Sequence, residues 1–172
     1  GWLASMIGIP YDALDNWRSV YPTETFVAQM QKVADGFAAG CELLQKAVAV
    51  SKGKYRKQLT DDLGRARTVG IHCASSANQA RFTEARNRLL TSTDRDERRR
   101  YIDTMRRAAE AEAELTDDLL PIVRNDPTIG YESSNHYFYV PQDLLEKQLN
   151  IRYVLDWLDR QAEPRNSETS EQ

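Results

Sequence analysis

Apolar side chains recur at steps of three or four residues along most of this 172-residue chain, and the alternation typical of β-strands is nearly absent. In the first such segment, Thr23 and Glu24 after Pro22 indicate a helix start, and Gly53 stands where a helix usually ends. The apolar stripe consists of Phe26, Met30, Val33, Phe37, Cys41, Leu44 and Val48. It predicts a helix of roughly seven turns.

A second helix is predicted over 54–91, with mostly small residues on its apolar seam. Its seam alternates steps of four and three and consists of Leu59, Leu63, Ala66, Gly70, Cys73, Ala77 and Ala80. Small residues let a neighbouring backbone approach closely, and we expect Gly36 and Gly40 to allow the same from the preceding helix. Since a mid-helix glycine costs about 1 kcal/mol relative to alanine, tight packing between the two helices is the expected compensation.

Two further helices complete the pattern. Thr93 or Asp94 is a predicted N-cap, with Glu97 following, and the helix is expected to run to about Arg124 before the break at Asp126 and Pro127. Its stripe is Tyr101, Met105, Ala108, Leu115, Leu119 and Ile122. The last helix begins at Pro141, and its broad apolar face is Leu144, Leu145, Leu149, Ile151, Val154, Leu155 and Leu158.

These segments predict an all-α fold: an antiparallel bundle of three long helices, closed by a C-terminal helix, with an aromatic-rich loop before that last helix. Residues 1–22 are expected to form an irregular N-terminal stretch with a short helix, packed on an upstream domain. Residues 23–162 form the bundle. Residues 163–172 have no apolar side chain and predict a disordered tail.

The charge balance and the length of the apolar runs argue against two classes of partner, nucleic acids and membranes. With 23 basic and 26 acidic side chains and a net charge of −3, the chain does not look like a nucleic-acid binder. Its one arginine cluster is interleaved with acids at helical spacing, which is typical of a solvated, ion-paired face; it consists of Arg95, Arg98, Arg99, Arg100, Arg106 and Arg107. No apolar run is long enough to span a membrane, so no membrane contact is expected.

No complete catalytic or metal site emerges from the sequence, and no cofactor or metal is predicted. HExxH, glycine-rich phosphate loops and GxSxG are absent. His72, within the small-residue seam, is interpreted as a packed or half-exposed helix residue. Cys41 and Cys73 would lie roughly 12 Å apart along the helix axes, too far for a disulfide, and are interpreted as small buried hydrophobic residues.

The densest polar and aromatic stretch is the loop 129–140. It mixes large flat rings with hydrogen-bonding groups, the combination that a sugar requires for stacking on its C–H face and bonding its hydroxyls. The candidate ligand-binding residues are Tyr131, Glu132, Asn135, His136, Tyr137 and Tyr139. A structural interpretation stays open: aromatic residues in such a loop also cap the end of a helical bundle.

Two stretches, LDNWRSVYPTETFVAQMQKVADGF (14–37) and IGYESSNHYFYVPQDLLEKQLNIRYVL (129–155), resemble the helical C-terminal region of large bacterial glycoside hydrolases. The resemblance implies a helical accessory domain that follows a catalytic barrel in the same chain, with a saccharide as the ligand. It implies a secreted or periplasmic location. Tyr131, Glu132, Asn135, His136 and Tyr137 are the signature positions that it carries over.

The first residue is Gly1, with apolar residues close behind, which suggests a piece of a longer protein or an expression scar. The alternative to an accessory domain is a stand-alone helical protein-interaction module with a purely structural loop. A third interpretation, a complete small enzyme, requires Glu132 and His136 to share one concave pocket.

Overall fold

The structure is a computed structural model that describes residues 13–132 and 137–162, without the side chains of residues 17, 131, 132, 137, 138 and 162. It contains helices α1 (Leu14–Trp17), α2 (Thr23–Val50), α3 (Gly53–Thr91), α4 (Arg95–Asn125) and α5 (Pro141–Ala162), and the two-residue strands β1 (Tyr131–Glu132) and β2 (Tyr137–Phe138). The prediction of an all-α chain is confirmed, because this strand pair is the one departure from helix and turn in the described residues. The predicted tail 163–172 lies outside them.

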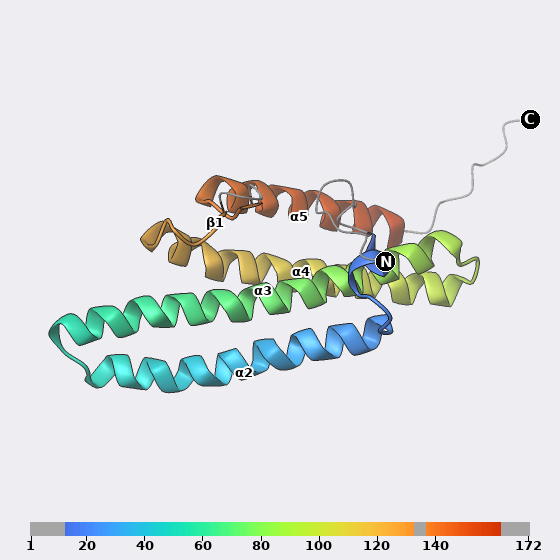
Figure 1. Cartoon of the computed structure of the whole chain (residues 1–172). Coiled ribbons are helices and arrows are strands. Elements are labelled where there is room, and N and C mark those ends of the chain that lie inside the picture. The colour runs from blue at the N-terminus through green and yellow to red at the C-terminus, as the bar shows by residue number, and fades with distance from the viewer. Residues whose placement is uncertain (1–12, 133–136, 163–172) are drawn as a thin grey trace, which may run out of the picture.

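The four long helices follow one another side by side in chain order, and consecutive helices run in opposite directions (Figure 1). The extensive contacts are α2 with α3, α3 with α4, and α4 with α5. The links are short, because Ser51 and Lys52 alone separate α2 from α3, and residues 92–94 separate α3 from α4. α3 and α4 therefore lie in the middle of the array, and α2 forms one edge.

Local sequence signals place most helix ends. The Asp94 side chain caps α4 by accepting a hydrogen bond from the Glu97 backbone N–H at 2.8 Å, as the sequence indicates. α4 ends at Asn125, before Asp126 and Pro127.

Gly53 does not end α2 as predicted. α2 stops at Val50, where the Ser51 hydroxyl donates to the Ala47 carbonyl oxygen at 2.7 Å, and Gly53 begins α3 with a φ of +55°. A two-residue reversal needs one residue in the left-handed region, and glycine adopts it without steric cost.

Helices α3, α4 and α5 share the apolar core. One cluster consists of Ala85 and Leu89 from α3, Ile102 and Met105 from α4, and Leu158 from α5. A second cluster at the other end joins Leu119 and Val123 of α4 to Leu144 of α5, with Ile71, Leu120, Ile129 and Tyr139 packed around it. The predicted stripes supply Met105 and Leu119 of α4 and Leu144 and Leu158 of α5 to these clusters. Ala85 and Leu89 lie beyond the seam predicted for α3, which ends at Ala80.

Helix α2 has a much thinner core than its sequence stripe suggests. Ala34 and Cys41 are its buried residues, whereas the side chain of Val33 is 43% exposed. Close packing with α3 occurs at Gly70, where an added Cβ would lie 3.1 Å from the Cβ of Phe37. A Cβ at position 70 would require Phe37 to move by a few tenths of an ångström.

The expectation for Gly36 and Gly40 is wrong. A Cβ added at either glycine would meet nothing within 4 Å, so these residues face open space and not α3. The cost of two mid-helix glycines, about 1 kcal/mol each relative to alanine, is thus not offset by packing within the described chain.

The remaining sequence interpretations are met in part. Both cysteines are free, as expected, but Cys41 is buried and Cys73 only half-buried. In the arginine cluster, Arg107 pairs with Asp103 on α4 at 2.9 Å, and Arg106 reaches Asp159 on α5 at 2.5 Å. No described helix is both long enough and apolar enough to cross a membrane.

Met105 gives a test of this core, because its side chain is 1% exposed among residues of α3, α4 and α5. We expect Met105→Ala to lower the free energy of unfolding by about 2–5 kcal/mol, since a buried methionine leaves a cavity when it is truncated. Urea denaturation followed by circular dichroism measures the change. Leu90→Ala, at a side chain that is 76% exposed, is the matched control and should change stability by less than about 0.5 kcal/mol.

Candidate functional site

The predicted loop is closed at its base by a short hairpin. Tyr131 pairs with Phe138 and Glu132 with Tyr137 in an antiparallel ladder, and the Tyr139 N–H donates to the Gly130 carbonyl oxygen at 2.7 Å. Gly130 has a φ of +95°, and an added Cβ would lie 2.7 Å from the Tyr139 carbonyl oxygen. Glycine is therefore required where the chain enters the hairpin.

The structure places only part of the predicted ligand-binding set. It describes the backbones of Tyr131, Glu132 and Tyr137 but not their side chains, and Asn135 and His136 lie outside the described residues. A complete small enzyme would need Glu132 and His136 in one pocket, and neither side chain is among those that the structure describes.

Tyr139 is the one predicted site residue whose side chain is described, and it packs on the helices. Its ring centroid lies 4.7 Å from that of His72 on α3, at an interplanar angle of 49°. It also packs against the core cluster of Leu119, Val123 and Leu144. This contact with the helices favours a structural role for Tyr139 at the end of the loop.

Beneath Tyr139 lies a buried polar network centred on Glu112 of α4, whose residue surface is 7% exposed. Glu112 Oε1 accepts hydrogen bonds from the Ser75 hydroxyl and from Lys147 Nζ, both at 2.5 Å. Glu112 Oε2 accepts from Asn78 Nδ2 at 3.2 Å. One carboxylate thus joins α3, α4 and α5.

The network continues from Asn78 to α2. Arg81 donates to Asn78 Oδ1 and, through its other terminal nitrogen, to Gln31 Oε1 of α2, each at 3.0 Å. Gln79 Nε2 donates to the Ser75 hydroxyl at 3.1 Å. Among the described residues, no buried side-chain polar atom lacks a hydrogen-bond partner.

A groove of about 460 Å³ opens between α3, α4 and α5 beside this network. Its apolar lining is Phe82, Ala108, Ala109, Ile151 and Val154. Its polar lining is Asn78, Gln79, Thr83, Arg86, Glu112, Asp143, Glu146, Lys147 and Asn150. We call this the α3–α4–α5 groove. Its volume lies within the usual range of small-molecule sites.

The loop and the groove meet at the first turn of α5. The Asp143 carboxylate, which lines the groove, accepts a hydrogen bond from the Val140 backbone N–H at 3.2 Å, just after the hairpin. Glu112 and Lys147 line both the groove and the small cavity under Tyr139 and His72. The Glu112–Lys147 ion pair therefore separates the groove from the loop anchor.

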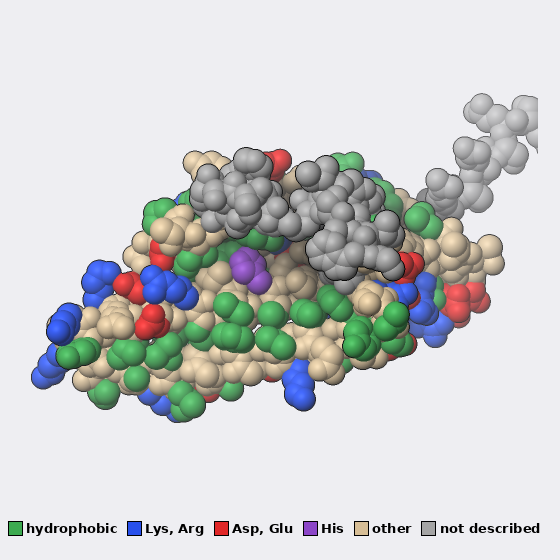
Figure 2. All heavy atoms as spheres, viewed as in Figure 1, with side chains coloured by type: hydrophobic (Ala, Val, Ile, Leu, Met, Phe, Trp, Pro, Cys, Tyr) green, Lys and Arg blue, Asp and Glu red, His purple; other side chains and the backbone are tan. Residues whose placement is uncertain are grey.

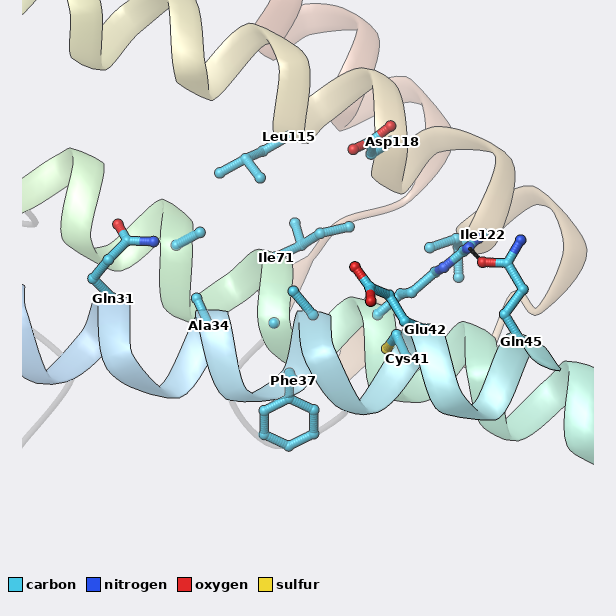
Figure 3. A pocket seen from close by; sticks show the side chains of 14 residues that line it. Gln31, Ala34, Phe37, Cys41, Glu42, Gln45, Ile71, Leu115, Asp118 and Ile122 are labelled. Carbon is cyan, nitrogen blue, oxygen red and sulfur yellow. Dashed lines mark hydrogen bonds between the residues drawn. The ribbon is translucent and has the colours of Figure 1, made fainter. Parts of the chain in front are cut away.

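A second groove, of about 490 Å³, lies between α2, α3 and α4. Figure 3 shows Gln31, Glu42 and Gln45 of α2 near Ile71, Leu115 and Ile122, and it shows Phe37 pointing away. Arg67 donates to Gln45 Oε1 at 3.0 Å across its mouth. Phe37 is the aromatic residue of its lining, and its ring points away from the other side chains in Figure 3, which makes this groove the weaker candidate for a ligand that stacks on rings.

His72 is electrostatically coupled to the network. Burial lowers the pKa of His72 from the ordinary histidine value of 6.5, and the positive charge of Lys147 lowers it further, while the negative charge of Glu112 opposes both. His72 is therefore held in its neutral form near neutral pH. The described residues contain no group of three or more side chains suited to bind a metal ion.

Sequence reasoning missed the Glu112 network, although one signal was present. In the α4 stripe, Met105, Ala108, Leu115 and Leu119 leave a gap where the alternation of three and four requires a residue at position 112. A carboxylate at a core position must find partners, because burying an unpaired charge is costly. The polar Ser75 and Asn78 lie on the buried face of α3 for the same reason.

Comparisons with protein-family models, with curated proteins and with solved structures found no match to this chain.

Replacing Glu112 tests the network. We expect Glu112→Ala to lower the free energy of unfolding by about 2–3 kcal/mol, because it leaves Lys147, Ser75 and Asn78 without their acceptor. The expected loss is below that of a fully buried pair, since the Lys147 side chain is 30% exposed. The double variant Glu112→Leu/Lys147→Met should recover part of it. Equal stability of wild type and Glu112→Ala in urea would contradict this assignment.

The lowered pKa of His72 predicts a pH dependence. The unfolded chain binds a proton at His72 more readily than the folded chain, so the stability due to neutral His72 is lost as the pH falls below about 6.5. Between pH 7.5 and 5.5, the free energy of unfolding should fall more in wild type than in His72→Gln. Parallel pH profiles for the two proteins would show that His72 does not carry the effect.

Proposed function

We propose that this chain is a helical accessory domain of a carbohydrate-active enzyme of the glycoside hydrolase type, and that its α3–α4–α5 groove binds a saccharide. The observation that carries the proposal is the lining of the groove. Carboxylates, amides and cations from α3 and α5 share one space with the ring of Phe82. A sugar needs both kinds of group, because its hydroxyls exchange hydrogen bonds while its C–H faces pack on apolar surface.

The polar groups of the groove differ in how firmly they are held. Glu112 and Asn78 are buried and already bonded to each other, so they form a fixed wall. Glu146 and Asn150 are exposed on α5. We assign direct contact with hydroxyl groups to these exposed side chains, because a ligand would displace only water from them.

The loop 129–140 extends this site in the proposal. Its hairpin leads directly into α5, whose first turns supply Asp143, Glu146 and Lys147 to the groove. Tyr139 anchors the loop on His72, and Tyr131, Glu132, Asn135, His136 and Tyr137 would contact the saccharide beyond the groove. Tyr139 itself is assigned a positioning role.

An exposed apolar stripe on α5 supports the accessory-domain part of the proposal. Leu145, Leu149 and Tyr153 are 47%, 65% and 67% exposed, and their spacing of four residues places them on one side of the helix. Contiguous exposed apolar surface of this kind marks contact with another protein or domain. The catalytic domain of the same polypeptide is the partner that we propose for it.

The second candidate is a protein-interaction module with a structural loop. The packing of Tyr139 on His72 and on the core cluster of Leu119, Val123 and Leu144 favours it. In that case the α5 stripe would bind a separate protein, and the α3–α4–α5 groove would bind no sugar.

A titration with oligosaccharides separates the two candidates. We expect amide resonances near the α3–α4–α5 groove to shift in an NMR titration of the full chain with a panel of plant and bacterial oligosaccharides. Glu146→Ala should weaken that binding roughly tenfold, the effect of losing one hydrogen bond to a charged group. Glu114→Ala, at an exposed glutamate on α4 away from the groove, is the control. No shift with any saccharide, or equal losses in both variants, would reject the proposal.

A further inference from the structure

We propose that the end of the α2–α3 hairpin docks on a membrane surface that carries anionic phospholipids. We call this region the hairpin tip, and its cations are Lys46, Lys52, Lys54, Arg56 and Lys57. Its apolar members are Val50 and Tyr55. The inference is independent of the proposed saccharide site, because the lining of the α3–α4–α5 groove begins at Asn78.

The charge of the hairpin tip is of one sign. Residues 43–60 contain five cations and no acid, although the whole chain has a net charge of −3, so the rest of the chain carries −8. Asp61 and Asp62 follow directly, and they pair with Lys57 at 2.8 Å and with Arg65 at 3.3 Å. The other four cations of the tip form no ion pair with a described residue. They are therefore available to an anionic partner.

The hairpin tip projects from one end of the molecule. α2 and α3 are joined there by Ser51 and Lys52 alone, and Figure 1 shows this end reaching beyond α4 and α5. Residues 52–58 are all exposed, and Figure 2 shows Lys and Arg side chains gathered at this end. A projecting surface can meet a flat partner, whereas a small ligand needs a concave site.

Two exposed apolar side chains distinguish among anionic partners. Val50 is 81% exposed and Tyr55 is 64% exposed, and Lys54 Nζ lies 5.2 Å from the ring centroid of Tyr55. At a membrane surface, apolar side chains enter the boundary of the acyl chains while lysine and arginine contact the headgroups, and tyrosine is enriched at that level. A nucleic-acid duplex offers phosphates but no apolar layer for Val50. The combination therefore favours a membrane.

Docking of this kind needs no spanning helix. The expectation of no membrane contact rests on the lack of a long apolar run, which excludes a spanning segment and not attachment to the surface. Each lysine or arginine near an anionic bilayer strengthens binding about fivefold, and this attraction falls off within a Debye length of about 8 Å at physiological ionic strength. Because the tip projects, its cations approach the surface before the acidic remainder of the chain does.

Co-sedimentation of the full chain with lipid vesicles tests the charges of the tip. Vesicles of phosphatidylglycerol and phosphatidylcholine in equal parts should bind the chain at low salt and release it as salt is added, and vesicles of phosphatidylcholine alone should not bind it. Lys52→Gln/Lys54→Gln should weaken binding about 25-fold, or about fivefold per charge. Arg95→Gln/Arg99→Gln removes two exposed cations from the other end of the molecule and should leave binding nearly unchanged.

Val50→Ser tests the apolar part of the contact. It should weaken vesicle binding roughly fivefold, because the valine side chain leaves water when the tip docks. Val20→Ser, at a valine that is 88% exposed, is the matched control, and circular dichroism confirms that each variant folds.

Three outcomes would overturn the proposal. The first is a wild-type chain that does not bind the phosphatidylglycerol vesicles. The second is an equal loss of binding in the tip variants and in their controls. The third is a chain that binds a DNA duplex in preference to the vesicles, with Val50→Ser as tight as wild type, because the tip would then recognise phosphates alone.

Discussion

The arrangement of α3, α4 and α5 depends on one buried carboxylate. Glu112 lies at a core position of α4 and takes hydrogen bonds from Ser75 and Asn78 of α3 and from Lys147 of α5. A buried ion pair adds little net stability, but any sliding of one helix past another would leave its charges unpaired. We infer that Glu112 fixes the mutual register of the three helices. Glu112 lines both the α3–α4–α5 groove and the small cavity under Tyr139, so the shapes of both depend on this register.

Helix α2 packs on α3 without contributing a buried carboxylate among the described residues. It is attached to α3 through close packing at Gly70 and through single side-chain contacts, such as those of Gln31 and Gln45 with α3 arginines. Because α3 covers only one side of α2, Val33, Leu43 and Val50 stay exposed in the described part of the chain. The second groove lies at this edge of the array, between α2, α3 and α4.

Much of the fold could be predicted from the sequence, because helix ends depend on neighbouring residues. The N-cap at Asp94 and the break before Pro127 are local effects, and the structure has both. The candidate site was harder to predict. Tyr139 looked like a ligand-binding residue because the composition of its loop suits a sugar. Its ring packs instead on His72, 67 positions earlier in the chain. Glu112 was missed, because nothing near it in sequence reveals that Lys147 will lie opposite.

The sequence by itself determined that the chain is helical, where its long helices lie and which stripe of each is apolar, since periodicity and capping act over a few residues. Only the tertiary structure decided which stripes are covered. Gly36 and Gly40 carry the same local signal as Gly70, but Gly70 meets Phe37 while the other two face open space. That difference arises because a helix at the edge of an array has one neighbour, and the number of neighbours is a property of the whole fold.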